Sequence, residues 1–268
     1  MSRQDQMQRR NRVLADDNPQ SVAILQGVDT LAATTYQVKI IMDQDTANYL
    51  FNQKYSLYAF KAVQTAVGGG KPTVWFQTMK YSTKTNISWQ VQYQAYTSSS
   101  EIKPGVTIDA SFTVNINLGQ LLTVDNGTGT GTVTSAGSPG TISIWNTTNV
   151  DFTCGIAQSA NGADGQPMCA FPLIGQDKDV IAPIEKVLLM FATQTVNTGT
   201  VIEKAYGPGV LIDLTGAPAN TREVTYKKSY GWDWGGYAWG SSTEPNQDLV
   251  PLLIDDSALR LAASYVGA

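Results

Sequence analysis

Two stretches in the first half of the chain alternate strictly between apolar and polar residues, and this pattern limits the fold more than any other feature. The first covers residues 87–95 and the second residues 106–118. Successive side chains of a strand point to opposite faces, so a period of two predicts strands with one buried and one wet face. The polar link between the two stretches turns at Pro104-Gly105. We therefore expect two long antiparallel strands.

Several further segments have strand character and are separated by turn residues. They cover residues 36–42, 56–67, 73–81, 141–145, 187–196, 200–203, 210–214 and 222–230. The run 187–196 is almost continuously apolar, which predicts a central strand covered on both faces. The segments 56–67 and 73–81 flank a glycine-rich link and are a hairpin candidate. The Gly-, Thr- and Ser-rich residues 125–140 predict a mobile loop or a flexible hairpin.

Helices are expected in only two places, over residues 47–53 after a cap at Asp45-Thr46 and over residues 255–265. About ten strands with so little helix predict an all-β fold. The expected architecture is an antiparallel β-sandwich, or a partly open barrel, of about ten strands with one or two short helices. A polar N-terminal arm over residues 1–18 is expected to precede a single β-sandwich domain over residues 19–268.

The chain contains no histidine. This excludes the Ser-His-Asp and Cys-His mechanisms and the histidine-based sites for zinc, copper and non-haem iron. The glycine-rich run 127–131 lacks the lysine and the strand-to-helix context of a phosphate-binding loop. We therefore expect no cofactor, no metal site and no catalytic residue, and we interpret the chain as a binding protein before an enzyme.

A carboxylate-dependent glycosidase is the enzyme alternative, because two carboxylates suffice for that chemistry. The five glutamates of the chain are Glu101, Glu185, Glu203, Glu223 and Glu244. Each is interpreted first as a solvated surface charge. The aspartate pairs Asp43/Asp45 and Asp177/Asp179 lack the full oxygen set of a calcium loop and are interpreted as turn and cap residues.

The net charge of −4 and the scattered basic residues argue against nucleic-acid binding, which needs clustered cations. No run approaches the roughly 20 apolar residues that a membrane span needs. Residues 1–20 also lack the apolar centre of a secretory signal. Synthesis in the cytosol and removal of an earlier leader both stay open, so the localisation is undetermined.

Two cysteines, Cys154 and Cys169, flank a loop rich in Gly, Asp and Pro. In an oxidising compartment they could close this loop as a disulfide, and in the cytosol they would stay reduced. Two thiols without histidine do not make a zinc site.

Residues 230–239 hold five aromatic side chains on a glycine-rich backbone. They are Tyr230, Trp232, Trp234, Tyr237 and Trp239. The interspersed glycines disfavour a buried strand, so we expect these rings on a pliable loop. Amphipathic aromatic rings suit stacking on sugars and also the headgroup level of a lipid bilayer. The five residues are therefore the predicted ligand-binding site, and the structural alternative is that they cap the open end of the sandwich.

The leading hypothesis is a non-enzymatic recognition protein that contacts glycans or membrane lipid headgroups through this segment, as a lectin- or cytolysin-type toxin or defence protein would. In general character the chain resembles small β-rich lectins and cytolysins, but no motif fixes a family and no residue roles follow. Charged residues make up only 15% of the chain, against roughly 25% in an average globular protein. Low charge, many strands and a polar arm also fit a self-assembling coat or fibre subunit, so homo-oligomerisation is the second hypothesis and the glycosidase the third.

Overall fold

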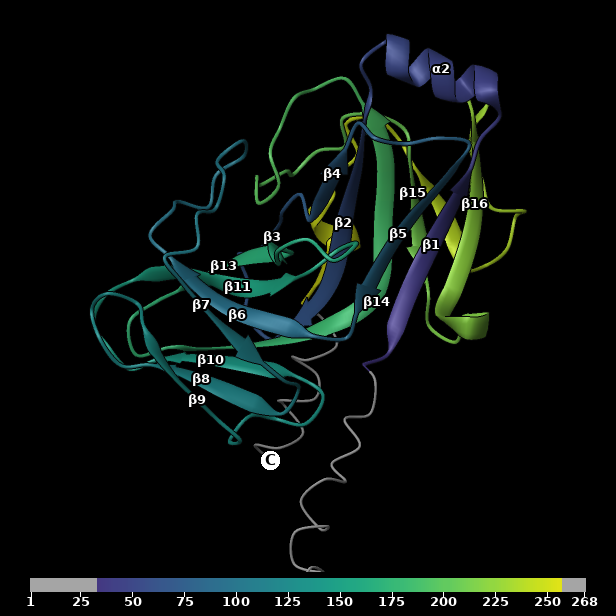
Figure 1. The fold of residues 1–268 in the computed structure, drawn as a ribbon. Coiled ribbons are helices and arrows are strands. Elements are labelled where there is room, and N and C mark those ends of the chain that lie inside the picture. Colours follow the sequence, from purple (N-terminus) through teal and green to yellow (C-terminus); the bar gives the residue numbers. More distant parts are fainter. Residues whose placement is uncertain (1–32, 257–268) are drawn as a thin grey trace, which may run out of the picture. The chain divides into compact units, whose positions relative to one another are not determined.

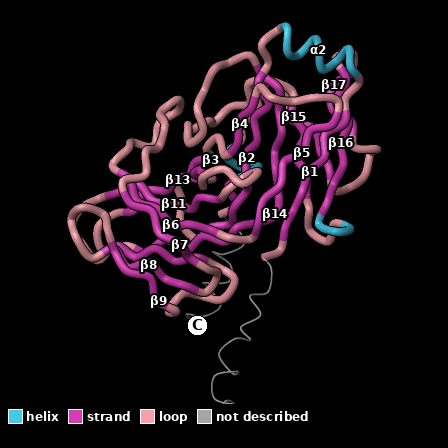
Figure 2. The backbone as a smooth tube through the Cα atoms, viewed as in Figure 1, coloured by secondary structure: helices cyan, strands magenta, loops and turns pink. Residues whose placement is uncertain are grey.

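A computed structural model describes residues 33–256, so the arm predicted over residues 1–18 and most of the helix predicted over residues 255–265 lie outside the described residues. Strands make up 49% and helices 7% of the structure, which forms three sheets including a curled half-barrel. The all-β prediction with short helices is confirmed, and the number of strands exceeds the ten expected. Figure 2 shows how little of the backbone is helical.

Two short α-helices and one turn of 3-10 helix interrupt the strands. They are α2 (Gln44–Asn52), α3 (Val250–Leu253) and η1 (Pro218–Asn220). The N-cap of α2 is Asp43, whose Oδ1 accepts a hydrogen bond from the backbone N of Thr46 at 2.7 Å. The cap was expected at Asp45-Thr46, so α2 begins slightly earlier than predicted. None of the described helices combines the length and the apolar character that crossing a membrane requires.

The first sheet has four strands in the order β17-β16-β1-β5. Its strands are β1 (Thr35–Ile41), β5 (Lys84–Gln90), β16 (Thr221–Lys227) and β17 (Gly231–Asp233). Strands β1 and β16 run parallel, so both end on the same side of the sheet, where α2 follows β1 (Figure 1). The sheets are thus mixed rather than purely antiparallel.

The second sheet has nine strands and is built around the long strand β14, which pairs with β2, β10 and β15. Its strands are β2 (Ser56–Thr65), β4 (Phe76–Thr78), β8 (Gln120–Val124), β9 (Gly131–Thr134), β10 (Ile142–Asn146), β14 (Lys178–Ala192), β15 (Gly209–Asp213), β18 (Gly240–Thr243) and β19 (Ile254–Asp255). The predicted central strand is the second half of β14, where residues 187–192 are buried. Residues 125–140 were expected to form either a mobile loop or a hairpin. They contribute to a hairpin, because β9 pairs antiparallel with β8.

The third sheet has six strands, with β3-β13-β11-β6-β7 in order and β12 attached to β11. Its strands are β3 (Lys71–Pro72), β6 (Tyr93–Ser98), β7 (Phe112–Ile116), β11 (Phe152–Gln158), β12 (Gln166–Pro167) and β13 (Cys169–Leu173). The antiparallel pair of β6 and β7 confirms one predicted contact, with Tyr93 opposite Ile116. The strand predicted over residues 106–118 is shorter than expected, because β7 covers only Phe112–Ile116.

The predicted single strand over residues 87–95 is wrong, because the chain changes sheet within it. Strand β5 ends at Gln90 in the first sheet and β6 starts at Tyr93 in the third. The backbone N of Gln92 donates to the carbonyl of Gln90 at 2.8 Å, which makes a tight turn at this point. The apolar residues on both sides of the turn face the same core, so the alternation continues across it.

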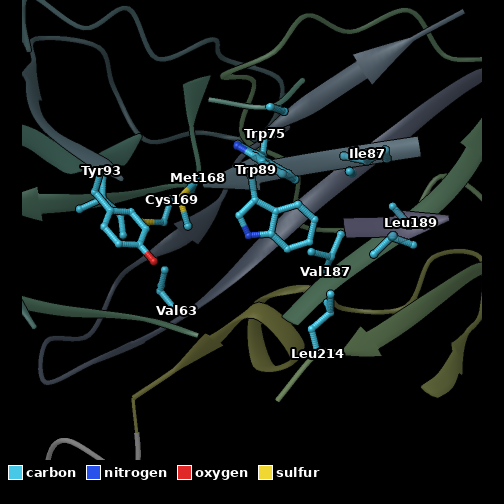
Figure 3. Packing of buried hydrophobic residues seen from close by; sticks show 14 of the residues in the cluster. Val63, Trp75, Ile87, Trp89, Tyr93, Met168, Cys169, Val187, Leu189 and Leu214 are labelled. Atoms are coloured by element: carbon cyan, nitrogen blue, oxygen red, sulfur yellow. The ribbon is translucent and has the colours of Figure 1, made fainter. Parts of the chain in front are cut away.

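The central core lies where elements of all three sheets meet. Trp75 and Trp89 pack edge to face, with their ring centroids 5.4 Å apart. Figure 3 shows these two indoles in the middle of the core, with Tyr93 and Met168 on one side and Leu189 on the other. All five side chains belong to one cluster of buried residues.

Candidate functional site

The aromatic segment connects the edges of two sheets. It starts at the turn after β16, forms β17 at the edge of the first sheet, and continues through residues 234–239 into β18 at the edge of the second. Gly231, Gly235 and Gly236 have φ angles of 83°, 73° and 69°, a region that side chains disfavour. A Cβ atom at Gly240 would lie 2.5 Å from the ring of Trp234. The glycines therefore provide turns and close packing.

Trp232 is held by the core. Its ring stacks on Phe191 at 5.3 Å and meets Tyr226 edge to face at 4.9 Å. Its Nε1 donates to the carbonyl of Pro208 at 3.2 Å. Trp234 and Trp239 are also half-buried and pack against the core cluster. Of the five rings expected on a pliable loop, Trp232 lies in strand β17 and only the two tyrosines are exposed, Tyr230 at 58% and Tyr237 at 63%.

The packing of Trp232 has a consequence for stability. In Trp232→Ala both ring contacts are lost, and each such contact stabilises by roughly 0.5–1.5 kcal/mol. We expect the free energy of unfolding, measured in urea, to fall by about 2 kcal/mol. The control is Tyr237→Ala, which removes an exposed ring with one stacking contact, to Trp239, and should lower the free energy of unfolding by only about 0.5 kcal/mol. Equal effects of the two substitutions would contradict the packing described here.

Four aromatic rings line one open groove of about 400 Å³. They are the rings of Tyr226, Tyr230, Trp232 and Trp234. Polar side chains share the groove, among them Lys228, Ser229, Ser242, Thr243 and Glu244. Apolar ring faces beside hydrogen-bonding groups can hold a ligand that has both characters. We call this site the aromatic groove.

Tyr237 and Trp239 do not line the aromatic groove. Their rings stack on each other at 5.9 Å with an interplanar angle of 15°, and the guanidinium of Arg222 lies 5.0 Å from the ring centroid of Trp239. The structure thus separates the five predicted residues into two groups. Tyr230, Trp232 and Trp234 line the groove, whereas Tyr237 and Trp239 stack on each other beside Arg222. Sequence reasoning missed Tyr226 and Glu244, which come from the strand before the segment and from the loop after it.

Most of the five glutamates have a lysine partner. Glu203 pairs with Lys71 at 2.7 Å, and Glu101 pairs with Lys103. Glu223 is exposed, as predicted for a surface charge, and Glu244 borders the aromatic groove. Among residues 33–256, no group of three or more His, Cys, Asp or Glu side chains is placed to hold a metal ion.

Glu185 is not a plain surface charge, because it forms a largely buried ion pair with Lys61. The Lys61 Nζ lies 2.7 Å from Glu185 Oε2, and the lysine is completely buried. The Nζ also sits 4.2 Å from the ring centroid of Trp89, whose Nε1 donates to the same carboxylate at 2.9 Å. Burial lowers the pKa of Lys61, while the Glu185 charge works in the opposite direction. Since Lys61 has no access to solvent, we assign this pair to structure.

Both cysteines are free, buried thiols in the structure. Cys154 lies opposite Phe171 in the pairing of β11 with β13, so Cys169 is its diagonal neighbour. Diagonal Cα atoms are roughly 7–8 Å apart, more than a disulfide usually spans. The disulfide that the sequence left open is not formed here. Burial raises the pKa of the Cys169 thiol to about 12, so it is protonated at neutral pH.

Cys154 instead contacts a carboxyl group. Its Sγ lies 3.0 Å from Oδ2 of Asp179, and both residues are buried. Burial raises the pKa of Asp179 to about 6, against the opposing effect of the thiol hydrogen bond. Asp179 was interpreted as a turn or cap residue, but it is an inward-facing residue of β14 opposite Ile144.

Comparisons with protein-family models, with curated proteins and with solved structures found no match for this chain.

Proposed function

We propose that this protein is a non-enzymatic recognition protein whose aromatic groove binds the rings of a glycan. The observation that carries the proposal is the gathering of an exposed tyrosine, Tyr230, with the half-buried rings of Trp232 and Trp234 in one groove. The core holds the Trp232 ring in place, so a ligand finds a preformed surface and little ordering is needed on binding.

The chemistry of the groove favours sugars over other ligands. Sugar rings have apolar faces that stack on indole and phenol rings, and hydroxyl edges that need hydrogen-bonding partners. Ser229, Ser242 and Glu244 line the groove and can supply such partners. Thr243 also lines the groove, although its side-chain oxygen is buried and has no hydrogen-bond partner among the described residues.

The absence of histidine and the pairing of two glutamates with lysines support a non-enzymatic role. The chain has no histidine, and both Glu185 and Glu203 are in ion pairs with lysines. A glycosidase needs two carboxyl groups on either side of one bond, and Glu244 is the one glutamate that lines the aromatic groove.

The test compares two tyrosines of the same segment. Binding of the wild type to a glycan array identifies a ligand, and titration calorimetry measures its affinity for each variant. We expect Tyr230→Ala to weaken binding about two- to tenfold, because one stacking contact is worth roughly 0.5–1.5 kcal/mol. Tyr237→Ala is the matched control, since Tyr237 is equally exposed but lies outside the groove, and its affinity should be unchanged.

Two results would overturn the proposal. One is a wild-type protein that binds no glycan on the array. The other is an equal loss of affinity in both variants, which would place the ligand away from the groove. Hydrolysis of a bound glycan, abolished by Glu244→Gln, would favour the glycosidase alternative instead.

A further inference from the structure

A second surface lies at the end of the first sheet where α2 follows β1. It consists of α2 with Lys54 just after it, residues 79–84 up to the start of β5, and the turn 227–230, and we call it the α2 end. The backbone N of Lys228 donates to Oγ1 of Thr46 at 3.2 Å, which ties the turn to the helix. Tyr81 donates from its hydroxyl to the carbonyl of Tyr55 at 2.8 Å, which ties the loop to the strand after α2. In Figure 1, α2 lies at the top, beyond the ends of β1 and β16.

The α2 end gathers exposed apolar side chains. Four of the nine large hydrophobic side chains that are exposed among the described residues lie here, namely Tyr49, Phe51, Met79 and Tyr230. Phe51 is the most exposed of the nine, at 64%. The buried residues of α2 are Thr46, Ala47 and Leu50, so the rings of Tyr49 and Phe51 flank the side by which α2 packs on the protein.

Lysines surround these apolar side chains. They are Lys54, Lys80, Lys84, Lys227 and Lys228, and all five are exposed. None of them forms an ion pair within 4 Å with another residue of the described part. Three aspartates lie in the same region, Asp43, Asp45 and Asp233. The α2 end is therefore positive, although the chain as a whole carries a net charge of −4.

Two of these lysines line a shallow hollow beside residues 80–86. It has a volume of about 360 Å³ and is lined by Lys80 and Lys84 together with the hydroxyl-bearing residues Tyr81, Ser82 and Thr85. The three hydroxyl groups already donate to backbone carbonyls. The two lysine ammonium groups are therefore the donors that the hollow offers to a phosphate, whose oxygens are strong acceptors.

We propose that the α2 end docks on a lipid surface that contains anionic phospholipids. Aromatic rings favour the headgroup level of a bilayer, and each lysine near an anionic surface strengthens binding about fivefold. A protein partner fits less well, because lysine is depleted from protein–protein interfaces. The sugar-binding aromatic groove gives no need for Phe51, Lys54 or Lys80, which lie outside it. The two surfaces share Lys228 and Tyr230, so the inference is tested at Phe51, Lys54 and Lys80, where the proposed function is not affected.

The experiment is cosedimentation of the full-length protein with phosphatidylcholine vesicles, with and without phosphatidylserine. We expect binding that requires phosphatidylserine and weakens as salt is added. Phe51→Ser should weaken it about tenfold, and Lys54→Gln/Lys80→Gln about 25-fold, from two lysines at about fivefold each. The control is Ile174→Ser, because Ile174 is also exposed, at 55%, but lies next to the carboxylate of Asp151, which accepts from the backbone N of Gly175.

The outcomes separate the alternatives. Loss in the α2-end variants with unchanged binding in Ile174→Ser supports the proposal. Absence of binding to phosphatidylserine vesicles overturns it, as does an equal loss in Ile174→Ser. Retention on a sulfated polysaccharide together with no vesicle binding would also overturn it and point to a soluble polyanion. Glycan binding by Phe51→Ser should equal that of the wild type, so a failure here leaves the aromatic groove untouched.

Discussion

Replacing Lys61 by methionine should lower the free energy of unfolding by about 3 kcal/mol. The substitution removes one partner of a buried ion pair and leaves the Glu185 carboxylate without its cation, a change that costs roughly 3–5 kcal/mol in other proteins. We expect the lower end because the Glu185 side chain keeps 14% of its surface in contact with solvent. Urea unfolding followed by tryptophan fluorescence measures the effect.

The double variant separates the charge from the packing. In Lys61→Met/Glu185→Gln no charge is left unpaired, and the amide oxygen can still accept from Nε1 of Trp89, which lies 2.9 Å from the carboxylate in the wild type. We expect most of the lost stability to return. Lys186→Met is the matched control, because this neighbouring lysine is half-exposed and lies 3.6 Å from Asp213. An exposed pair of that kind contributes less than about 1 kcal/mol. A loss in Lys186→Met as large as in Lys61→Met would contradict the assignment.

The sequence could not reveal this ion pair. Lys61 stands in an apolar run that predicts a strand, and its partner Glu185 is 124 residues away in the chain. What brings them together is the pairing of β2 with β14, where the register shifts between Ile184 and Val187. A lysine in the middle of an apolar strand was the available signal, since such a side chain requires a buried partner.

The alternation of apolar and polar residues predicted strand character well and the sheet assignment poorly. It located β5, β6 and β7, because burial on one face is a local property of each strand. It did not locate the change of sheet after Gln90, because the first and third sheets enclose the same core. An alternation with a period of two shows which face of a strand each side chain is on. It does not show which other strand lies next to it in a sheet.

The aromatic segment shows the same limit at the candidate site. Composition predicted that the five rings lie together on a pliable loop. In the structure Gly235 and Gly236 have positive φ angles, and the segment also contains the short strand β17. The position of each ring depends on residues elsewhere in the chain. Phe191 stacks on Trp232, and Arg222 lies beside Trp239. The division of the five rings into two groups is therefore a property of the fold.

Asp179 is a buried acid without a cation partner within 4 Å among the described residues. Its hydrogen-bond donor is the thiol of Cys154, a weak donor, so its charged form is poorly compensated. Burial raises its pKa from 3.8 to about 6. The folded state therefore holds the proton more tightly than the unfolded chain. The stability gained from this proton is complete below pH 3.8 and is lost as the pH rises to about 6.

Asp179→Asn should remove this pH dependence. The neutral amide carries no charge to desolvate, so at pH 7 the variant should be more stable than the wild type by up to about 3 kcal/mol, the equivalent of a two-unit pKa shift. The advantage should shrink toward zero as the pH falls from 6 to 4, where Asp179 itself becomes protonated. Urea unfolding of both proteins at several pH values in this range measures the difference. Asp164→Asn, at an exposed aspartate elsewhere on the surface, is the control and should run parallel to the wild type. A variant that is less stable than the wild type at pH 7 by the same amount as at pH 4 would show that Asp179 is not a desolvated acid.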